Sequence, residues 1–134
     1  MRITKITIVN KQSTPDNVND LLLAFGNSLG LFSLRDKDKS CYRIFIVLVK
    51  ALKVGIELTS DELALQTGLT RGTVVHHLNH LMATGIVTNF RNKYFIPVKN
   101  LHELVEQMRA SVNESFDNIG VLAKKIDADL ELNR

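Results

Sequence analysis

Cysteine is nearly absent from this chain of 134 residues, because Cys41 is the only one. A single thiol cannot form an intrachain disulfide, and it cannot build the cysteine cluster of a structural zinc site. We therefore expect the chain to work in a reducing compartment. We interpret Cys41 as a small residue of the hydrophobic core rather than as a redox sensor.

Long apolar runs are missing as well. The longest, Ile44 to Val49, is far shorter than a membrane-spanning helix, and Met1 to Lys5 lead into no apolar stretch of a signal peptide. The sequence also has no glycine-rich phosphate loop, nucleophile motif or paired carboxylates. These absences favour a cytoplasmic protein that is not an enzyme, has no cofactor and does not contact a membrane.

Charge is modest in amount but uneven along the chain. There are 17 Lys and Arg against 14 Asp and Glu, which gives a net charge of +3. Residues 41–97 contain six basic and three acidic side chains, whereas residues 98–134 contain five and seven. A basic middle permits contact with nucleic-acid phosphates without requiring it.

Hydrophobic periodicity divides the chain into three parts. In residues 1–40, the alternation around Ile6 and Ile8 predicts a short strand, and a helix is expected near residues 16–32 with caps among residues 13–16. Its apolar seam, spaced four and three residues apart, is Val18, Leu22, Phe25, Leu29 and Phe32. We interpret residues 1–40 as an N-terminal extension that dimerises through Val18, Leu22, Phe25 and Leu29.

Residues 41–97 are predicted to form several helices followed by a β-hairpin. A helix from about Ser40 to Val54 ends at Gly55, and a capping box from Thr59 to Glu62 opens a short helix, Asp61 to Gln66. After a turn at Gly68 and Leu69, Thr70 caps another helix, which ends at Gly85. Alternating residues 86–90 and 93–96 then predict a β-hairpin. Short helix, tight turn, second helix and hairpin is the order of a winged helix-turn-helix.

Residues 98–134 predict one long helix, from Asn100 to about Glu131, with a coiled-coil-like seam. One position of the heptad is β-branched in four successive repeats, at Val105, Val112, Ile119 and Ile126. A small core cannot bury an apolar stripe of this length. We therefore assign this segment to dimerisation through Val105, Val112, Ile119, Leu122 and Ile126.

The middle segment also carries a family resemblance. ELALQTGLT at residues 62–70 looks like the "ELA…tGLs" entry of the arsenic-responsive-repressor (ArsR) and MarR-like transcription regulators. TVVHHLNHL at residues 73–81 is similar to their "TVSHHLKKL" helix, and ATGIV at residues 83–87 resembles the "eaGLV" step into the wing. The resemblance implies a mostly α fold with a small β wing, and a DNA-binding function. Val75 departs from it, because these families usually carry a small polar residue there.

The helix at residues 70–84 has two different faces. Val74, Leu78, Leu81 and Met82 form a core stripe, whereas the opposite face is polar and suited to the major groove of DNA. The candidate contacts of this recognition helix are Thr70, Arg71, Gly72, Thr73, Val75, His76, Asn79 and His80. The wing, residues 86–96, adds Arg91, Asn92 and Lys93, which can meet the phosphate backbone. Arg71 is the best candidate for a bidentate contact with guanine or phosphate.

Three histidines in five residues also raise the question of a metal site. His76 and His80 are four residues apart, a spacing at which two imidazoles can share an ion. However, no cysteine or carboxylate lies in that helix, so we assign no metal. His77 borders the core, and we expect it to be half-buried.

Together these features predict a winged helix-turn-helix with flanking dimerisation helices. We expect a sequence-specific regulator of transcription that binds double-stranded DNA at an inverted repeat as a homodimer. The alternative is a winged-helix scaffold for protein interaction, with incidental DNA affinity. A small-molecule effector is not indicated by any residue set and stays unknown.

Overall fold

The structure is a computed structural model and describes residues 17–32 and 39–130. The strand expected around Ile6 and Ile8 and the caps expected among residues 13–16 lie outside the described residues. Within them, the chain forms α1 (Val18–Ser28), α2 (Ser40–Val54), α3 (Ser60–Thr67), α4 (Arg71–Ala83), β1 (Thr88–Phe90), β2 (Lys93–Phe95) and α5 (Leu101–Asp129). This confirms the mostly helical fold with a small two-stranded wing after the helix-turn-helix.

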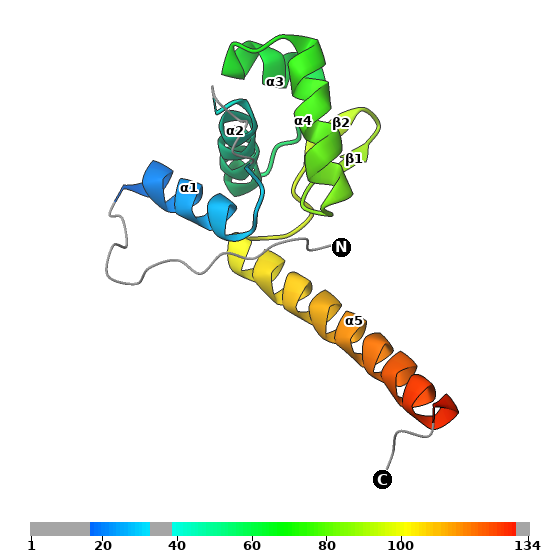
Figure 1. Cartoon of the computed structure of the whole chain (residues 1–134). Helices are drawn as coiled ribbons and strands as arrows, with labels where there is room; N and C mark the ends of the chain where they lie inside the picture. Colours follow the sequence, from blue (N-terminus) through cyan, green and yellow to red (C-terminus); the bar gives the residue numbers. More distant parts are fainter. Residues whose placement is uncertain (1–16, 33–38, 131–134) are drawn as a thin grey trace.

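Helix α2 is the centre of the body, because it packs on α1, α3, α4 and β2 (Figure 1). Its bounds agree with the sequence prediction, and its buried face is apolar except for Ser40 at its start. The core gathers side chains from every described helix, mainly Leu22, Leu31, Cys41, Ile44, Phe45, Leu48, Leu58, Leu63, Val74, Leu78, Leu81, Ile86, Ile96 and Leu104. Cys41 is one of these residues, and its Sγ lies 3.6 Å from the Leu31 carbonyl oxygen.

Helix α1 is shorter than its seam suggested. Asn17 is its N-cap, accepting from the backbone N–H of Asn19, and the helix ends at Ser28 rather than running to Phe32. Gly30, at φ 70°, turns the chain, and the N–H of Leu31 donates to the Gly26 carbonyl. This pairing is a Schellman ending, in which glycine adopts a left-handed conformation at little cost.

The same ending closes α2 and α4. Gly55 and Gly85 also have positive φ, and the residue after each donates its N–H to the carbonyl five residues earlier in the chain. In α4 this turn delivers Ile86 into the core. A glycine followed by an apolar residue is therefore the common stop signal of three helices, and at Gly30 it overrides the continuing periodicity.

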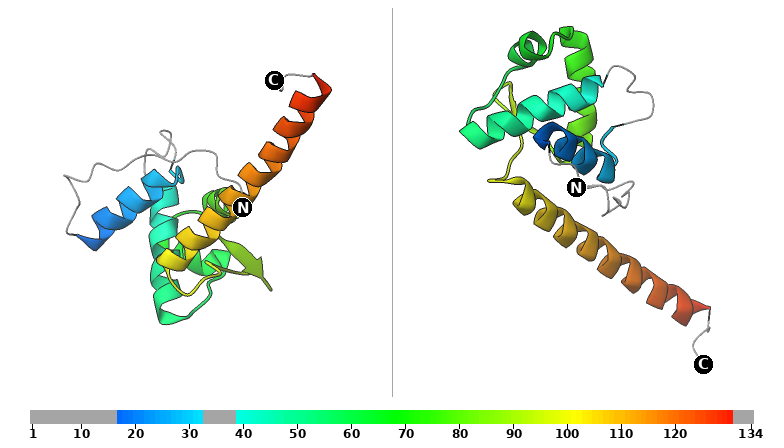
Figure 2. Two further views of the ribbon diagram at one scale, coloured as in Figure 1. Left: turned by 90° about the horizontal axis from the view of Figure 1, so that it is seen from below. Right: turned by 90° about the vertical axis from the view of Figure 1, so that its left-hand side faces the viewer.

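Helix α5 leaves the body as a long rod (Figures 1 and 2). Asn100 caps its N-terminus by accepting from the N–H of Glu103. Leu104 and Met108 are buried against the body, whereas the helix beyond Val112 is almost entirely exposed. Leu104 is not one of the residues that the sequence placed on the seam, so the buried part of the helix uses a wider face than a coiled-coil seam.

Candidate nucleic-acid interface

The turn between α3 and α4 is built from short-range capping interactions. Thr59 and Glu62 form the expected capping box, and Gly68 closes α3 at φ 71°. The Thr67 hydroxyl donates to the Leu63 carbonyl at 2.6 Å. The guanidinium of Arg43, from α2, donates to the Thr67 carbonyl, which ties the turn to the central helix. Thr70 then caps α4 by accepting from the N–H of Thr73 at 3.2 Å, as predicted.

Helix α4 has the two faces that the sequence indicated. Val74, Leu78 and Leu81 are fully buried, and Met82 is half-buried beside them. On the other side, Thr70, Arg71, Gly72, His76, Asn79 and His80 are exposed, while Thr73 and Val75 are half-buried. A Cβ added to Gly72 would meet no atom within 4 Å, so the backbone there is open to a ligand. Gly72, Thr73, His76, Asn79 and His80 therefore lie on one side of the helix, while Thr70 and Arg71 are exposed at its start.

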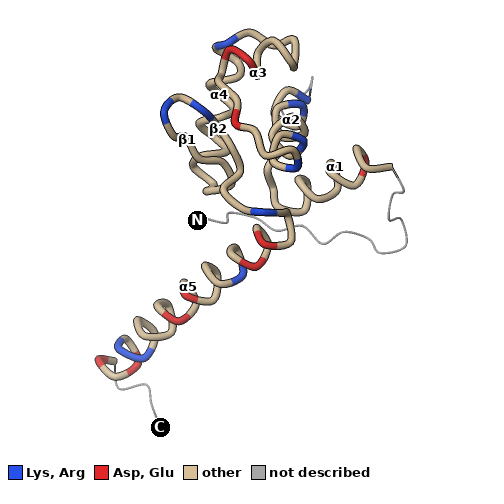
Figure 3. The backbone as a smooth tube through the Cα atoms, turned by 180° about the vertical axis from the view of Figure 1, so that it is seen from behind, with Lys and Arg blue, Asp and Glu red and all other residues tan. Residues whose placement is uncertain are grey.

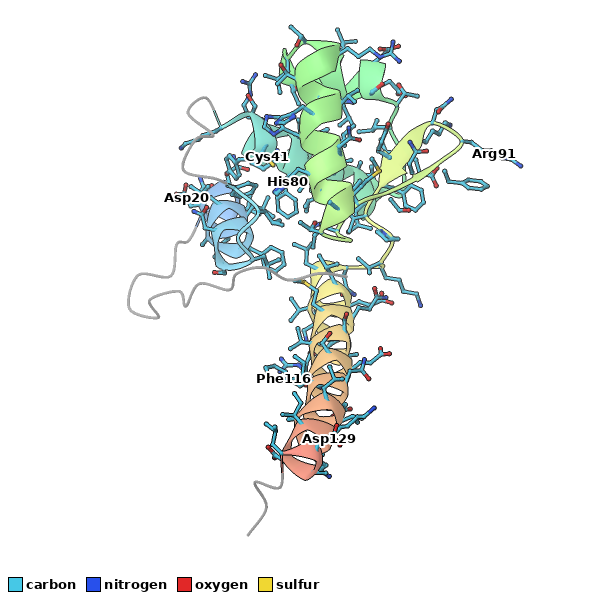
Figure 4. All side chains as sticks on the ribbon, turned by 45° about the vertical axis from the view of Figure 1, so that its right-hand side comes forward. Asp20, Cys41, His80, Arg91, Phe116 and Asp129 are labelled. Carbon is cyan, nitrogen blue, oxygen red and sulfur yellow. The ribbon has the colours of Figure 1, made fainter. Side chains whose placement is uncertain are left out.

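The histidines divide between this surface and the body. His76 is exposed, whereas His77 is half-buried as expected, and their rings meet edge to face with centroids 5.2 Å apart. His80 is exposed; Figure 4 labels it on α4. Among the described residues, no group of three or more His, Cys, Asp or Glu is placed to hold a metal ion.

The wing presents its cations at a tight turn. Strands β1 and β2 pair with Phe90 opposite Lys93, and the two turn residues, Arg91 and Asn92, have φ values of 54° and 65°. Positive φ at both central residues is the two-residue hairpin turn whose twist suits paired strands. The N–H of Asn92 donates to the Asn89 side chain at 3.2 Å. The Arg91 guanidinium lies over the Phe90 ring, 5.1 Å from its centroid, and points away from the body in Figure 4.

Two acidic residues of α3 lie beside cations of α4 and of the wing, an arrangement that the sequence did not predict. Arg71 Nε lies 3.5 Å from Asp61 Oδ1, so the first turn of α3 is next to the first turn of α4. Red and blue segments adjoin there in Figure 3. The pKa of Glu62 is lowered, mainly because its carboxylate accepts the Thr59 backbone N–H, then through the Thr59 hydroxyl and, as a smaller cause, through nearby Lys93. No sequence period links Asp61 to Arg71, because their distance depends on the angle between two helices.

The residues assigned to dimerisation occupy two different environments. Leu22, which the sequence assigned to dimerisation, is buried in the core of its own chain, where α1 packs on α2. Phe25, Leu29, Val105 and Val112 are half-buried, and Phe25 stacks on Phe45. Val18, Ile119, Leu122 and Ile126 are exposed. Phe116 was not predicted, although it is 67% exposed on the same helix and is labelled in Figure 4.

Comparisons with known proteins support the resemblance to ArsR. Residues 48–89 match the family model described as "Bacterial regulatory protein, arsR family". The match begins within α2, includes both helices of the helix-turn-helix and ends in β1. No curated protein and no solved structure matches the chain. In the part of the chain that the structure describes, no helix is long and apolar enough to cross a membrane.

Proposed function

We propose that this chain binds a specific double-stranded operator in the cytoplasm. The premise is that residues 48–89 are the ArsR-family domain of a DNA-binding transcription regulator. Such a regulator acts by binding alone and needs no catalytic residue. The observation that carries the proposal is the polar face of α4, which is exposed along its length and whose back is anchored in the core.

This face and the exposed first turn of α4 together have the chemistry of major-groove recognition. Arg71 and Asn79 carry the side chains that pair with guanine and adenine edges, and open Gly72 lets the start of the helix approach a phosphate. The Thr70 hydroxyl and the first N–H groups of α4 lie at the same end. The DNA interface would then have two neighbouring parts. Helix α4 would read the bases, and the wing would contact the DNA phosphate backbone through Arg91, Asn92 and Lys93.

We further propose that the chain is a homodimer that reads an inverted repeat. Helix α5 supports this, because most of its apolar residues lie within about 60° of one line when drawn at about 100° per residue. The stripe is Leu101, Leu104, Val105, Met108, Val112, Phe116, Ile119, Leu122, Ala123, Ile126 and Leu130. The body covers only its first part, and a second copy would cover the rest in an isologous contact. Two recognition helices would then meet major grooves about 34–36 Å apart.

Selection of bound duplexes from a random DNA pool tests the proposal directly. A regulator enriches one inverted repeat, and its affinity for random duplex falls by orders of magnitude between about 50 and 200 mM salt as phosphate binding releases counterions. A winged-helix scaffold, the rival function, would enrich no sequence and show a shallow salt dependence. That outcome would reject the regulatory function.

A further inference from the structure

We propose that the acidic first turn of α3 sets the balance between specific and non-specific DNA binding, with Asp61 as the positioning residue for Arg71. The inference rests on the proposed function, since it concerns how the same interface discriminates between sequences. It is carried by an ion pair within the interface and by the packing of the α3 entry on the wing.

The first step is the geometry of the Asp61 contact. The carboxylate meets Arg71 at Nε, which leaves the two terminal nitrogens of the guanidinium unoccupied by this contact. Those two nitrogens form the fork that can bond to the O6 and N7 atoms of guanine. A side chain already held at Nε loses less rotamer freedom when its fork engages a base. Asp61 therefore favours an end-on contact by Arg71 over a contact through its side.

The second step is the electrostatic repulsion between the Asp61 carboxylate and a DNA phosphate. Asp61 is exposed, and a DNA backbone close to Arg71 also comes close to the carboxylate, which repels it. A phosphate attracted to Arg71 without a base contact meets this repulsion with nothing to offset it. The carboxylate therefore weakens binding to random sequence more than binding to an operator.

Glu62 extends the same effect to the wing. The backbone of Leu58 pairs with that of Tyr94 through two hydrogen bonds of 3.2 and 2.7 Å, which fixes the entry to α3 beside β2. This pairing places Thr59, whose N–H is held by the Glu62 carboxylate, next to Lys93. One acidic turn thus faces a cation of the recognition helix and a cation of the wing.

Two charge-removing variants and one remote control test the inference. Asp61→Asn removes the carboxylate beside Arg71, and Glu62→Gln removes the second charge while keeping a side chain that can complete the capping box. Asp117→Asn removes one exposed charge from α5, far along the rod and on the side opposite its apolar stripe. The control thus produces the same change in net charge without touching the interface.

The expected result is a selective gain in non-specific affinity. Each of Asp61→Asn and Glu62→Gln should bind random duplex about two- to fivefold more tightly at low salt, the range expected for one exposed charge pair. Asp61→Asn should not gain equally for the selected operator, so the ratio of operator to random affinity falls. In an Arg71→Gln background, Asp61→Asn should no longer change that ratio. An effect of the Asp61 charge that did not act through Arg71 would change the ratio equally in both backgrounds.

Two outcomes would overturn the inference while leaving the proposed function intact. One is that Asp61→Asn matches Asp117→Asn on both DNAs, and the other is that the operator ratio stays constant. The ion pair itself is tested without DNA by the NMR resonance of the Arg71 Nε–H, which should shift in Asp61→Asn and not in Asp117→Asn. An unchanged resonance would remove the ion pair on which the inference depends, even if the parent protein bound no DNA.

Discussion

Thr59 and Glu62 each satisfy the other's backbone N–H. The Thr59 hydroxyl accepts from the N–H of Glu62 at 3.1 Å, and the Glu62 carboxylate accepts from the N–H of Thr59 at 3.1 Å. This reciprocal pair fixes where α3 begins. Because α3 carries Asp61 and leads into the recognition helix, the position of the interface depends on it.

Removal of this cap should lower the stability of the whole domain. Thr59→Ala leaves the N–H of Glu62 without its partner, and we expect the free energy of unfolding to fall by about 1 kcal/mol. Thr59→Ser keeps the hydroxyl and should stay close to the parent. Chemical denaturation monitored by circular dichroism gives both values. Equal stability of the two variants would mean that the hydroxyl makes no net contribution.

The cap also predicts a pH dependence for Glu62. Its folded-state pKa lies below the ordinary value of 4.5 because the ionised carboxylate is the form that the Thr59 groups bind. The stabilisation is therefore complete above pH 4.5 and is lost as the pH falls through the folded pKa. The difference in stability between the parent and Glu62→Gln should be constant at neutral pH and shrink in acid. A difference that grows in acid would contradict this sign.

These local signals are the part of the fold that could be predicted from sequence. The Thr59 capping box, the cap at Thr70 and the stops at Gly55 and Gly85 all act over about six residues or fewer, so they can be recognised without knowing the tertiary structure. Gly30 carries the same stop signal. The sequence alone does not reveal it as the end of α1, because Phe32 continues the apolar spacing beyond it.

The remaining features depend on how helices pack, which periodicity does not specify. The spacing of Leu22 and of Ile119 indicates that each lies on an apolar stripe, but not whether the body of the same chain covers it. The pair between Asp61 and Arg71 depends on the crossing of α3 and α4. Predicting it would require the angle between the two helices, which the sequence of neither helix contains.

Two glycines in helices should respond in opposite directions to alanine. A Cβ on Gly26 would overlap the ring of Phe32, which is held edge to face against Tyr42 and Phe45, so Gly26→Ala should destabilise the protein by about 1–3 kcal/mol. Gly120 has open space around it, and Gly120→Ala should stabilise by about 0.5–1 kcal/mol. Thermal unfolding measures both. Stabilisation by Gly26→Ala would mean that the Phe32 ring moves freely.

Sequence preference should depend on two residues of α4. Arg71→Ala or Asn79→Ala should weaken binding to the selected operator by about 1–3 kcal/mol and relax the preference at one base position. Leu65→Ala, at an exposed position of α3, is a control on an adjacent helix. Titration of operator and single-base variants measures the effect. If both variants keep the parent's affinity and preference, the α4 face does not read bases.

The wing should contribute affinity without sequence preference. Replacement of Arg91 and Lys93 by Ala removes two cations, and binding to every duplex should weaken by a similar factor. The slope of log affinity against log salt should become shallower by about 0.9 for each phosphate that the variant no longer neutralises. Phe90→Leu, which keeps the charges but removes the aromatic ring under Arg91, should leave the slope unchanged. An unaltered slope in the double variant would exclude the wing from the interface.

The exposed half of α5 offers the sharpest test of the homodimer. Ile119 and Ile126 lie on the apolar stripe and are 57% and 54% exposed, so a charge at either position would be buried in an isologous contact. The double variant Ile119→Asp, Ile126→Asp should be monomeric at micromolar concentration, keep its helical circular dichroism and lose cooperative operator binding. Val121→Asp is the matched control, because Val121 is 66% exposed on the opposite side of the same helix. Sedimentation equilibrium should show a dimer for the parent and the control. A monomeric parent would end the two-half-site model, and dissociation of the Val121 variant would place the dimer interface on a different face of α5.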